Sequence, residues 1–213
     1  MIPRPILLAT SNPGKLRDFA GAAAPFGIAV TNLPNFFSLC PVVEDGTTFE
    51  ENARKKAEAY SRAAPGELVL SDDSGLEIDA LHGAPGVHSA RYAADDPKTD
   101  DPTTDNLKAT DVDHANNARV LRELRGLTAQ KRTARFVCVL AAARDGHTIR
   151  TFRGTAEGII LDAPRGHNGF GYDPLFYFPE IGKTFAELGA GEKARYSHRG
   201  AAFRAFLSWY RST

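Results

Sequence analysis

Apolar runs alternate with amphipathic stretches in the first third of the chain. Residues 5–9 form a short apolar run typical of a buried strand, and the polar turn after it leads into a helical pattern over residues 16–23. Thr48 is followed three residues later by Glu51, a capping box that predicts a helix over residues 49–64. These patterns predict a strand, a loop and a helix, followed by a second helix.

Period-two alternation appears further along the chain. Residues 68–70 predict a strand that stops at a turn containing Asp72 and Asp73, and residues 76–80 resume the alternation. We therefore expect the two carboxylates at the end of a strand.

The remainder of the chain begins with a polar stretch and continues with clustered strands. Residues 94–116 are rich in aspartate and interrupted by proline, which predicts a mobile surface loop, an insertion ahead of a helix over residues 117–124. Three strands and a closing helix are predicted over residues 135–143, 148–153, 156–161 and 200–210. Together these elements predict an α/β fold, a mixed β-sheet flanked by helices.

Composition limits the class of protein. A chain of 213 residues with 42% hydrophobic residues can bury a large core, as one domain or as two closely joined lobes. Its 26 basic and 26 acidic residues cancel, so no net positive charge favours a nucleic-acid partner. No stretch approaches the roughly 18 apolar residues of a membrane span, and no signal-peptide pattern is present. We expect a soluble cytoplasmic protein with no membrane partner.

Cysteine and histidine spacing does not indicate a redox or zinc centre. Cys40 and Cys138 lack CxxC spacing, and Cys138 lies in an apolar run, so both are interpreted as reduced structural thiols. His88 is interpreted as part of a structural turn. Zinc-ligand spacing is absent around the histidines His82, His114, His147 and His167.

A polar loop near the start of the chain has the features of a phosphate site. Residues 10–15 follow the first strand and precede a helix, so free backbone amides at the helix N-terminus and the Lys15 ammonium could bind phosphate oxygens. The loop does not match the P-loop pattern, and the same turn also serves as a purely structural connection.

Carboxylates offer a candidate metal site. Adjacent side chains on a strand point to opposite faces, so only one of Asp72 and Asp73 faces a given cleft, and we select Asp73. Such acidic residues also occur simply as turn formers. If Glu44 lies near Asp73, the pair suits Mg²⁺, which binds a few carboxylates together with substrate phosphates.

Two later motifs could contact a nucleobase. Residues 166–174 form a glycine-rich loop that carries Phe170, Tyr172 and Asp173, so rings and a carboxylate can approach a planar ligand. Residues 193–200 supply mainly hydrogen-bond donors, which match keto oxygens or phosphates. Without the neighbouring motifs, a charged run of this kind is typical of a solvent-exposed surface.

These motifs together resemble the inosine triphosphate pyrophosphatase family, the XTP/dITP diphosphatases that remove non-standard purine nucleotides. The resemblance extends from end to end. It is carried by residues 8–15, 49–53, 71–76, 83–92, 169–174 and 197–200.

The resemblance implies an elongated α/β fold with two lobes around a central cleft, a single domain over residues 1–213, and a homodimer. It also implies Mg²⁺-dependent release of pyrophosphate from a nucleoside triphosphate, with Glu44 and Asp73 as metal ligands and Asp73 as proton acceptor. The implied substrate contacts are Thr10, Ser11, Asn12, Pro13, Gly14, Lys15, Lys56, Ser74, Phe170, Gly171, Tyr172, Asp173, Lys193, His198 and Arg199. The polar 94–116 segment is longer than the family pattern.

The expected mechanism is direct attack of water. Asp73 would orient or deprotonate the water, and Lys15 would offset charge on the leaving pyrophosphate. Donors at His198 and Arg199 would favour a keto group over the amino group of adenine. Two alternatives stay open: a nucleotide-binding regulator that does not hydrolyse, and a related pyrophosphatase acting on pyrimidine or modified nucleotides.

Overall fold

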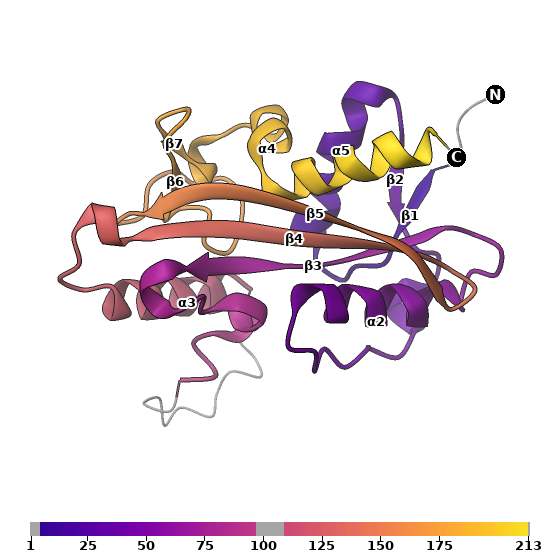
Figure 1. The fold of residues 1–213 in the computed structure, drawn as a ribbon, viewed down its shortest axis with the longest axis horizontal. Helices are drawn as coiled ribbons and strands as arrows, with labels where there is room; N and C mark the ends of the chain where they lie inside the picture. The colour runs from indigo at the N-terminus through magenta and orange to yellow at the C-terminus, as the bar shows by residue number, and fades with distance from the viewer. Residues whose placement is uncertain (1–4, 97–108, 213) are drawn as a thin grey trace. The chain divides into compact units, whose positions relative to one another are not determined.

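A mixed sheet organises the chain (Figure 1). Within residues 5–96 and 109–212, which the computed structural model describes, seven strands follow the order β2-β1-β3-β4-β5-β6-β7. The strands are β1 (Ile6–Leu8), β2 (Val30–Asn32), β3 (Val69–Ile78), β4 (Thr133–Arg144), β5 (His147–Ile160), β6 (Phe176–Phe178) and β7 (Lys183–Thr184). β1 pairs in parallel with β2 and β3, whereas β6 pairs antiparallel with β5 and β7.

Helices flank the sheet, so the predicted fold class is confirmed. The α-helices are α1 (Pro13–Ala23), α2 (Phe49–Ser61), α3 (Ala109–Glu123), α4 (Ala190–Tyr196) and α5 (His198–Tyr210). Short 3₁₀ turns include η4 (Gly86–Arg91), which contains His88 as expected for a structural turn. No helix among the described residues is long and apolar enough to cross a membrane.

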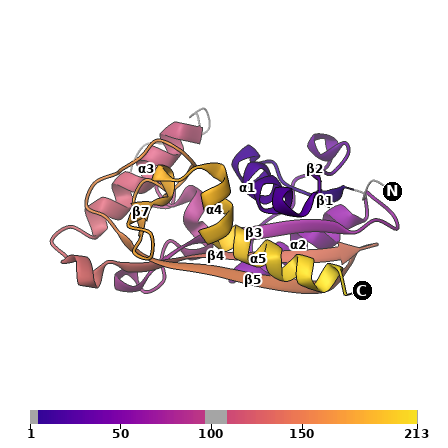
Figure 2. The ribbon, with the colours of Figure 1, turned by 90° about the horizontal axis from the view of Figure 1, so that it is seen from above.

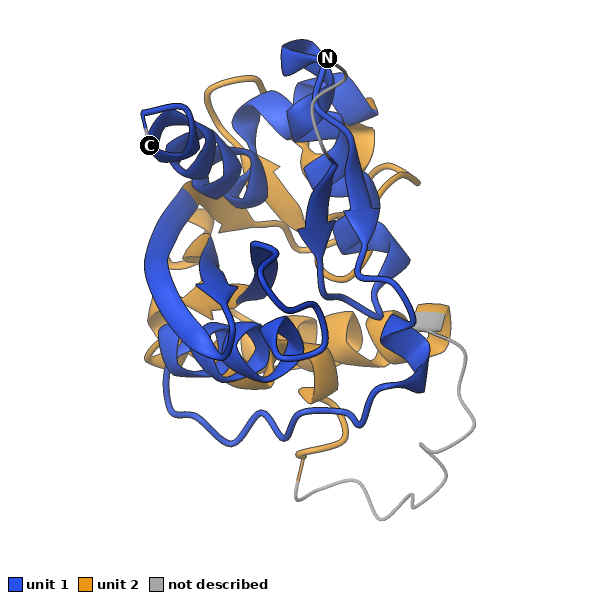
Figure 3. Cartoon of the chain, turned by 90° about the vertical axis from the view of Figure 1, so that its right-hand side faces the viewer, with its two compact units in different colours: residues 1–74, 137–155, 190–213 blue, residues 75–136, 156–189 orange. Residues whose placement is uncertain are grey.

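The chain divides into two compact units (Figure 3). Unit 1 comprises residues 1–74, 137–155 and 190–213, and unit 2 comprises residues 75–136 and 156–189. β3, β4 and β5 contribute residues to both units. The single domain with a central cleft stays a prediction.

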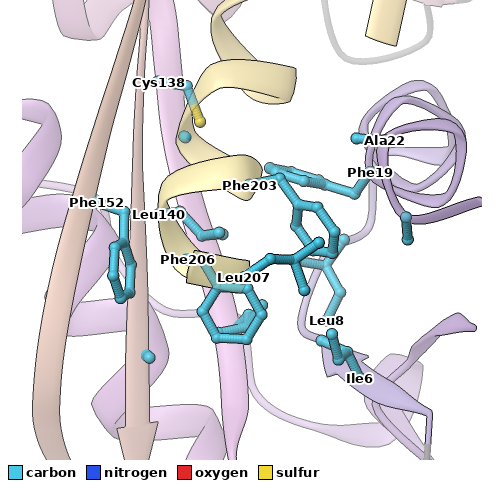
Figure 4. Packing of buried hydrophobic residues seen from close by; sticks show 14 of the residues in the cluster. Ile6, Leu8, Phe19, Ala22, Cys138, Leu140, Phe152, Phe203, Phe206 and Leu207 are labelled. Atoms are coloured by element: carbon cyan, nitrogen blue, oxygen red, sulfur yellow. The ribbon is translucent and has the colours of Figure 1, made fainter. Parts of the chain in front are cut away.

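The main core of unit 1 lies where α1 and α5 pack on the strands. Phe19 of α1 lies 6.0 Å from Phe203 of α5 between ring centroids, and both rings are fully buried. Figure 4 shows these rings together with Leu8, Leu140 and Phe206. Seen from above in Figure 2, α1 lies beside β1 and β2. Burial of each large side chain stabilises the fold by about 1.5–3 kcal/mol, so this face anchors unit 1.

α2 covers the opposite face of the same strands. Leu70 belongs to the core under α1 and α5, whereas its neighbour Val69 packs with Tyr60 of α2 in a separate cluster. Because adjacent strand residues point to opposite faces, the two clusters lie on opposite sides of the sheet. Figure 1 shows α2 and α5 on these two sides.

Unit 2 has an aromatic core of its own. Phe136 of β4 lies 4.6 Å from Phe176 of β6 between ring centroids, and Phe185 stacks on Phe136 at 5.8 Å. α3 contacts the η4 turn. The aromatic contacts thus pack β4, β6 and Phe185 together, and α3 packs on the η4 turn.

Several predicted boundaries were wrong. β3 continues through Asp72 and Asp73, so these carboxylates lie inside a strand and not at its end. β5 is likewise one strand, not two. Gly154 lies within it and leaves room for α5, since an added Cβ would lie 2.2 Å from the carbonyl oxygen of His198. α5 begins at His198, after the Ser197 N-cap, and not at residue 200.

The polar 94–116 segment also differs from its prediction as a loop. α3 begins at Ala109, eight residues before the predicted start, so the last part of the segment is helical. Residues 97–108 lie outside the described residues. The capping box of α2 is present as predicted, although the helix ends at Ser61. Cys138 is buried in β4 as expected, whereas Cys40 is exposed.

Candidate active site

The loop over residues 10–15 is held by its own polar side chains. Asn12 is the N-cap of α1, and its Oδ1 accepts hydrogen bonds from the amides of Gly14 at 2.8 Å and Lys15 at 3.2 Å. Thr10 Oγ1 accepts from the Asn12 amide at 3.1 Å. The expectation of free amides at this helix start was therefore wrong for Gly14 and Lys15, because the Asn12 cap occupies both.

Lys15 extends from this loop to Asp72. The Lys15 Nζ lies 3.0 Å from Asp72 Oδ2, and Ser74 Oγ donates to the same oxygen at 2.9 Å. Burial acts to raise the pKa of Asp72, but the charges of Lys15, Arg199 and Lys56 outweigh it and hold that pKa below its ordinary value. Asp72 is therefore a compensated buried anion.

Asp73 points to a different set of partners. Asn52 Nδ2 of α2 donates to Asp73 Oδ2 at 3.1 Å, and Lys56 Nζ lies 3.6 Å from Asp73 Oδ1. Lys56 Nζ also lies 2.5 Å from Glu44 Oε2, so one ammonium is shared by both carboxylates. Burial raises the pKa of Asp73, and the nearby Glu44 charge adds to this, against the opposing charges of Lys56 and Lys15.

The Glu44 and Asp73 pair is compatible with a hard cation. Two carboxylates that converge on one ammonium show that positive charge is stabilised between them, and oxygen donors are the ligands that Mg²⁺ prefers. The described residues contain no group of three or more metal-ligating side chains. A divalent ion at this place would thus need additional oxygen ligands from a substrate or water.

The basic residues of the last two helices converge on one acidic residue of α1. Asp18 Oδ2 lies 3.0 Å from a terminal nitrogen of Arg199 and 3.3 Å from Lys193 Nζ. The other terminal nitrogen of Arg199 donates to Ser74 Oγ at 2.8 Å. Lys193 and Arg199 are both buried, so Asp18 and Asp72 supply the negative charge that compensates them.

His198 lies next to this cluster and is fully buried. It is the first residue of α5, directly after the Ser197 N-cap. Burial lowers its pKa well below the ordinary value, and the positive charges of Arg199, Lys193 and Lys15 lower it further. The imidazole is therefore neutral at physiological pH and carries one N–H donor.

The glycine-rich loop of residues 169–173 belongs to unit 2. Asp173 Oδ2 accepts a hydrogen bond from the Phe170 amide at 2.9 Å, and the Tyr172 hydroxyl donates to the Ser89 carbonyl at 2.8 Å. Tyr172 and Asp173 are buried, whereas Phe170 is half-buried. Tyr172 and Asp173 thus stabilise the loop itself, and Phe170 presents the more accessible ring.

Within unit 1 the structure brings most of the predicted residues into one charged network. It contains Lys15, Glu44, Lys56, Asp73, Ser74, Lys193 and Arg199. Ser11 is exposed, and Pro13 is the N1 residue of α1.

Sequence reasoning missed two members of this network, Asp18 and Asn52. Asp18 lies three residues after Lys15, on the same side of the predicted helix, and this spacing was a usable signal. Asn52 lies four residues before Lys56, so α2 presents both toward Asp73. Neither spacing identifies the distant partner that each side chain binds.

The chain is similar to known proteins along nearly its whole length. The chain is 50% identical over 207 residues to a protein of Thermus thermophilus named dITP/XTP pyrophosphatase, covering 97% of this chain and 91% of the relative. A protein of the same name from Acidobacterium capsulatum is 47% identical over 205 residues, covering 95% of this chain and 96% of the relative.

Solved structures of similar proteins also match nearly the whole chain. The Ham1 protein of Staphylococcus aureus matches with a TM-score of 0.76 and 38% identity, covering 98% of this chain and 99% of that one. A HAM1 protein from Coxiella burnetii matches with a TM-score of 0.78 and 35% identity, covering 99% and 100% of the two chains. The model of the Ham1 family matches residues 6–209. This chain belongs to the Ham1 family.

Proposed function

We propose that this protein is a Mg²⁺-dependent nucleoside triphosphate pyrophosphatase. Its substrates are non-standard purine nucleotides, dITP, XTP and ITP, which it converts to the monophosphate and pyrophosphate, so that they are not incorporated into nucleic acid. The observation that carries the proposal is the charged network of unit 1, in which Lys56 joins Glu44 to Asp73 and Lys15 lies against Asp72. The names of the relatives support the same activity.

Glu44 and Asp73 are the proposed metal ligands. A bound Mg²⁺ would neutralise phosphate charge and orient the triphosphate for hydrolysis. Lys56, which is buried and shared by both carboxylates, is proposed to contact phosphate oxygens when substrate is present. Its pKa is held high by Asp73, Asp72 and Glu44 against the effect of burial, so it stays protonated.

Asp73 is the proposed proton acceptor. Burial makes its carboxylate more basic than an exposed aspartate, and Asn52 fixes one of its two oxygens by a 3.1 Å hydrogen bond. Lys15, whose ammonium lies beside Asp72, would stabilise charge on the leaving pyrophosphate. No protein nucleophile is needed, because water is the attacking group.

Discrimination between bases is assigned to donor groups. His198, Arg199 and Lys193 offer N–H groups that match the 6-keto oxygen of hypoxanthine or xanthine and not the amino group of adenine. Phe170, Gly171, Tyr172 and Asp173 remain the proposed loop contacts of the base. We also propose that the protein works in the cytoplasm, where the nucleotide pool is found, and as a homodimer.

Pyrophosphate release tests the activity. The wild type is incubated with dITP, XTP, ITP, ATP and dTTP, with Mg²⁺ or with EDTA. We expect release from the three non-standard purine nucleotides only, and none with EDTA. Asp73→Asn should lower kcat by about 10²-fold or more, in line with the loss of a general base, while circular dichroism and the unfolding midpoint show that the fold is kept.

The outcomes separate the competing functions. Binding of ITP without pyrophosphate release would indicate the nucleotide-binding regulator. A clear preference for dTTP or another pyrimidine would indicate the related pyrophosphatase. Turnover by Asp73→Asn at the wild-type rate would show that Asp73 is not the proton acceptor.

A further inference from the structure

α3 holds Gly171 of the glycine-rich loop by both of its backbone polar groups. The Gly171 amide donates to Asp113 Oδ2 at 2.7 Å, and Asn117 Nδ2 donates to the Gly171 carbonyl oxygen at 2.9 Å. Asp113 and Asn117 are four residues apart on α3, so their side chains project from one helix face. Gly171 has a φ of 61°, a conformation that other residues rarely adopt.

Asn116, the residue before Asn117 on α3, binds backbone groups of Ser89 in the η4 turn and of Ala93. Asn116 is buried; its Oδ1 accepts from the Ala93 amide at 2.7 Å, and its Nδ2 donates to the Ser89 carbonyl at 3.4 Å. The hydroxyl of Tyr172 donates to the same Ser89 carbonyl at 2.8 Å. Consequently α3, the η4 turn and the loop form one continuous hydrogen-bonded network.

This arrangement fixes the direction of the side chains on either side of Gly171. A residue whose amide and carbonyl are both bound has the two flanking peptide planes fixed, and Phe170 and Tyr172 are attached to those planes. The ionised form of Asp113 is disfavoured at this place. Burial and the nearby Asp173 charge raise its pKa, against the lowering effect of the Gly171 amide. A side chain that served only to cover the loop would not need a charged group here.

We propose that Asp113 and Asn117 are positioning residues that hold the 169–173 loop in the conformation that receives the nucleobase. Part of this inference rests on the proposed function, because it takes the loop to be a base contact. It assigns a role to the helical end of the polar 94–116 segment, which carries Asp113. Both side chains bind Gly171, which is neither a proposed metal ligand nor a proposed phosphate contact.

The test uses matched variants of the full-length protein. Asp113→Ala and Asn117→Ala each remove one of the two bonds to Gly171, whereas Asp113→Asn keeps an oxygen acceptor without the charge. Asp111→Ala removes an exposed carboxylate of the same helix and serves as the control. Two quantities are measured: amide hydrogen exchange at Gly171, and kcat and KM for dITP and ITP.

We expect Asp113→Ala to speed exchange of the Gly171 amide by about fivefold or more, because a net hydrogen bond is lost. Asp113→Ala and Asn117→Ala should each raise KM by about three- to tenfold, with kcat within about twofold of the wild type, because binding of the base is weakened and the phosphate chemistry is not. Asp113→Asn should restore exchange and KM to nearly wild-type values, and Asp111→Ala should change neither.

If the Gly171 amide exchanges as slowly in Asp113→Ala as in the wild type, the proposal that its hydrogen bond to Asp113 holds the loop is refuted. Faster exchange with unchanged KM would refute the positioning role, as would a fall in kcat without a change in KM. If the wild type itself releases no pyrophosphate from dITP or ITP, the proposed function fails, and the exchange data still decide whether α3 holds the loop.

Discussion

At the scale of single residues, two adjacent aspartates have opposite electrostatic environments. Asp72 is compensated by Lys15 and Arg199, so its pKa is held low despite burial, whereas burial and Glu44 raise the pKa of Asp73. Strand alternation explains the contrast, since it directs the two side chains to opposite faces of β3. One carboxylate therefore anchors buried cations, and the other is the better proton acceptor.

His198 gives a prediction about protonation. Burial, with Arg199, Lys193 and Lys15 nearby, disfavours the imidazolium, so the ring should stay neutral from pH 8 down through pH 6. Its NMR signals, assigned by comparison with His198→Gln, should show no titration in that range. A transition near the ordinary value of 6.5 would contradict the assignment.

At the scale of elements, α2 and α3 have parallel roles. α2 presents Asn52 and Lys56 at i,i+4 spacing to Asp73, and α3 presents Asp113 and Asn117 at the same spacing to Gly171. In both cases consecutive turns of a helix hold a residue that belongs to another element. The stability of these helices therefore matters for the geometry of the residues that they hold.

The capping box of α2 can be tested directly. Thr48 Oγ1 accepts from the Glu51 amide at 3.1 Å, and Glu51 Oε2 accepts from the Thr48 amide at 3.2 Å. Thr48→Ala should lower the free energy of unfolding by about 1 kcal/mol, because an amide at the helix start loses its acceptor. Thr48→Ser, which keeps the hydroxyl, should stay close to the wild type. Urea denaturation measures both, and equal midpoints for Thr48→Ala and the wild type would contradict the role of the cap.

At the scale of the whole molecule, acidic and basic residues are equal in number, and several of them form ion pairs. The 26 acidic and 26 basic residues give a net charge of +0, yet buried charges gather around Asp18, Asp72 and Asp73. Such charges are tolerated in a folded protein only while their partners keep the opposite charge. Each of these groups should therefore make stability depend on pH, in a direction set by the shift of its pKa.

We predict that His198 and Asp72 each make a contribution to stability that is lost in acid, in two separate pH ranges. The pKa of His198 is lowered in the fold, so its contribution is lost as pH falls below the ordinary value of 6.5, where only the unfolded chain takes up the proton. The pKa of Asp72 is also lowered, so its contribution is present above the ordinary value of 3.8 and is lost as pH falls through the folded value. Calorimetric melting temperatures from pH 8 to pH 3 measure this. His198→Gln should remove the first stage, and a pH dependence of the melting temperature that is the same in His198→Gln and the wild type would contradict the prediction.

The local patterns of the sequence determined much of the fold and part of the site. Apolar patterning predicted the first strand and the helix over residues 16–23, the Thr48 and Glu51 spacing predicted the start of α2, and strand alternation separated Asp72 from Asp73. The motifs also identified the family. All of these features depend on residues within a few positions of each other, which is why they are readable along the chain.

Tertiary structure alone decided which distant groups meet. Arg199 binds Asp18 across 181 positions of sequence, and Asn117 binds Gly171 across 54. β3 runs unbroken through its aspartates although their polarity predicted a turn, because buried lysine and arginine side chains compensate the charges. Burial and the path of the chain set these contacts, and neither leaves a periodic signal in the sequence.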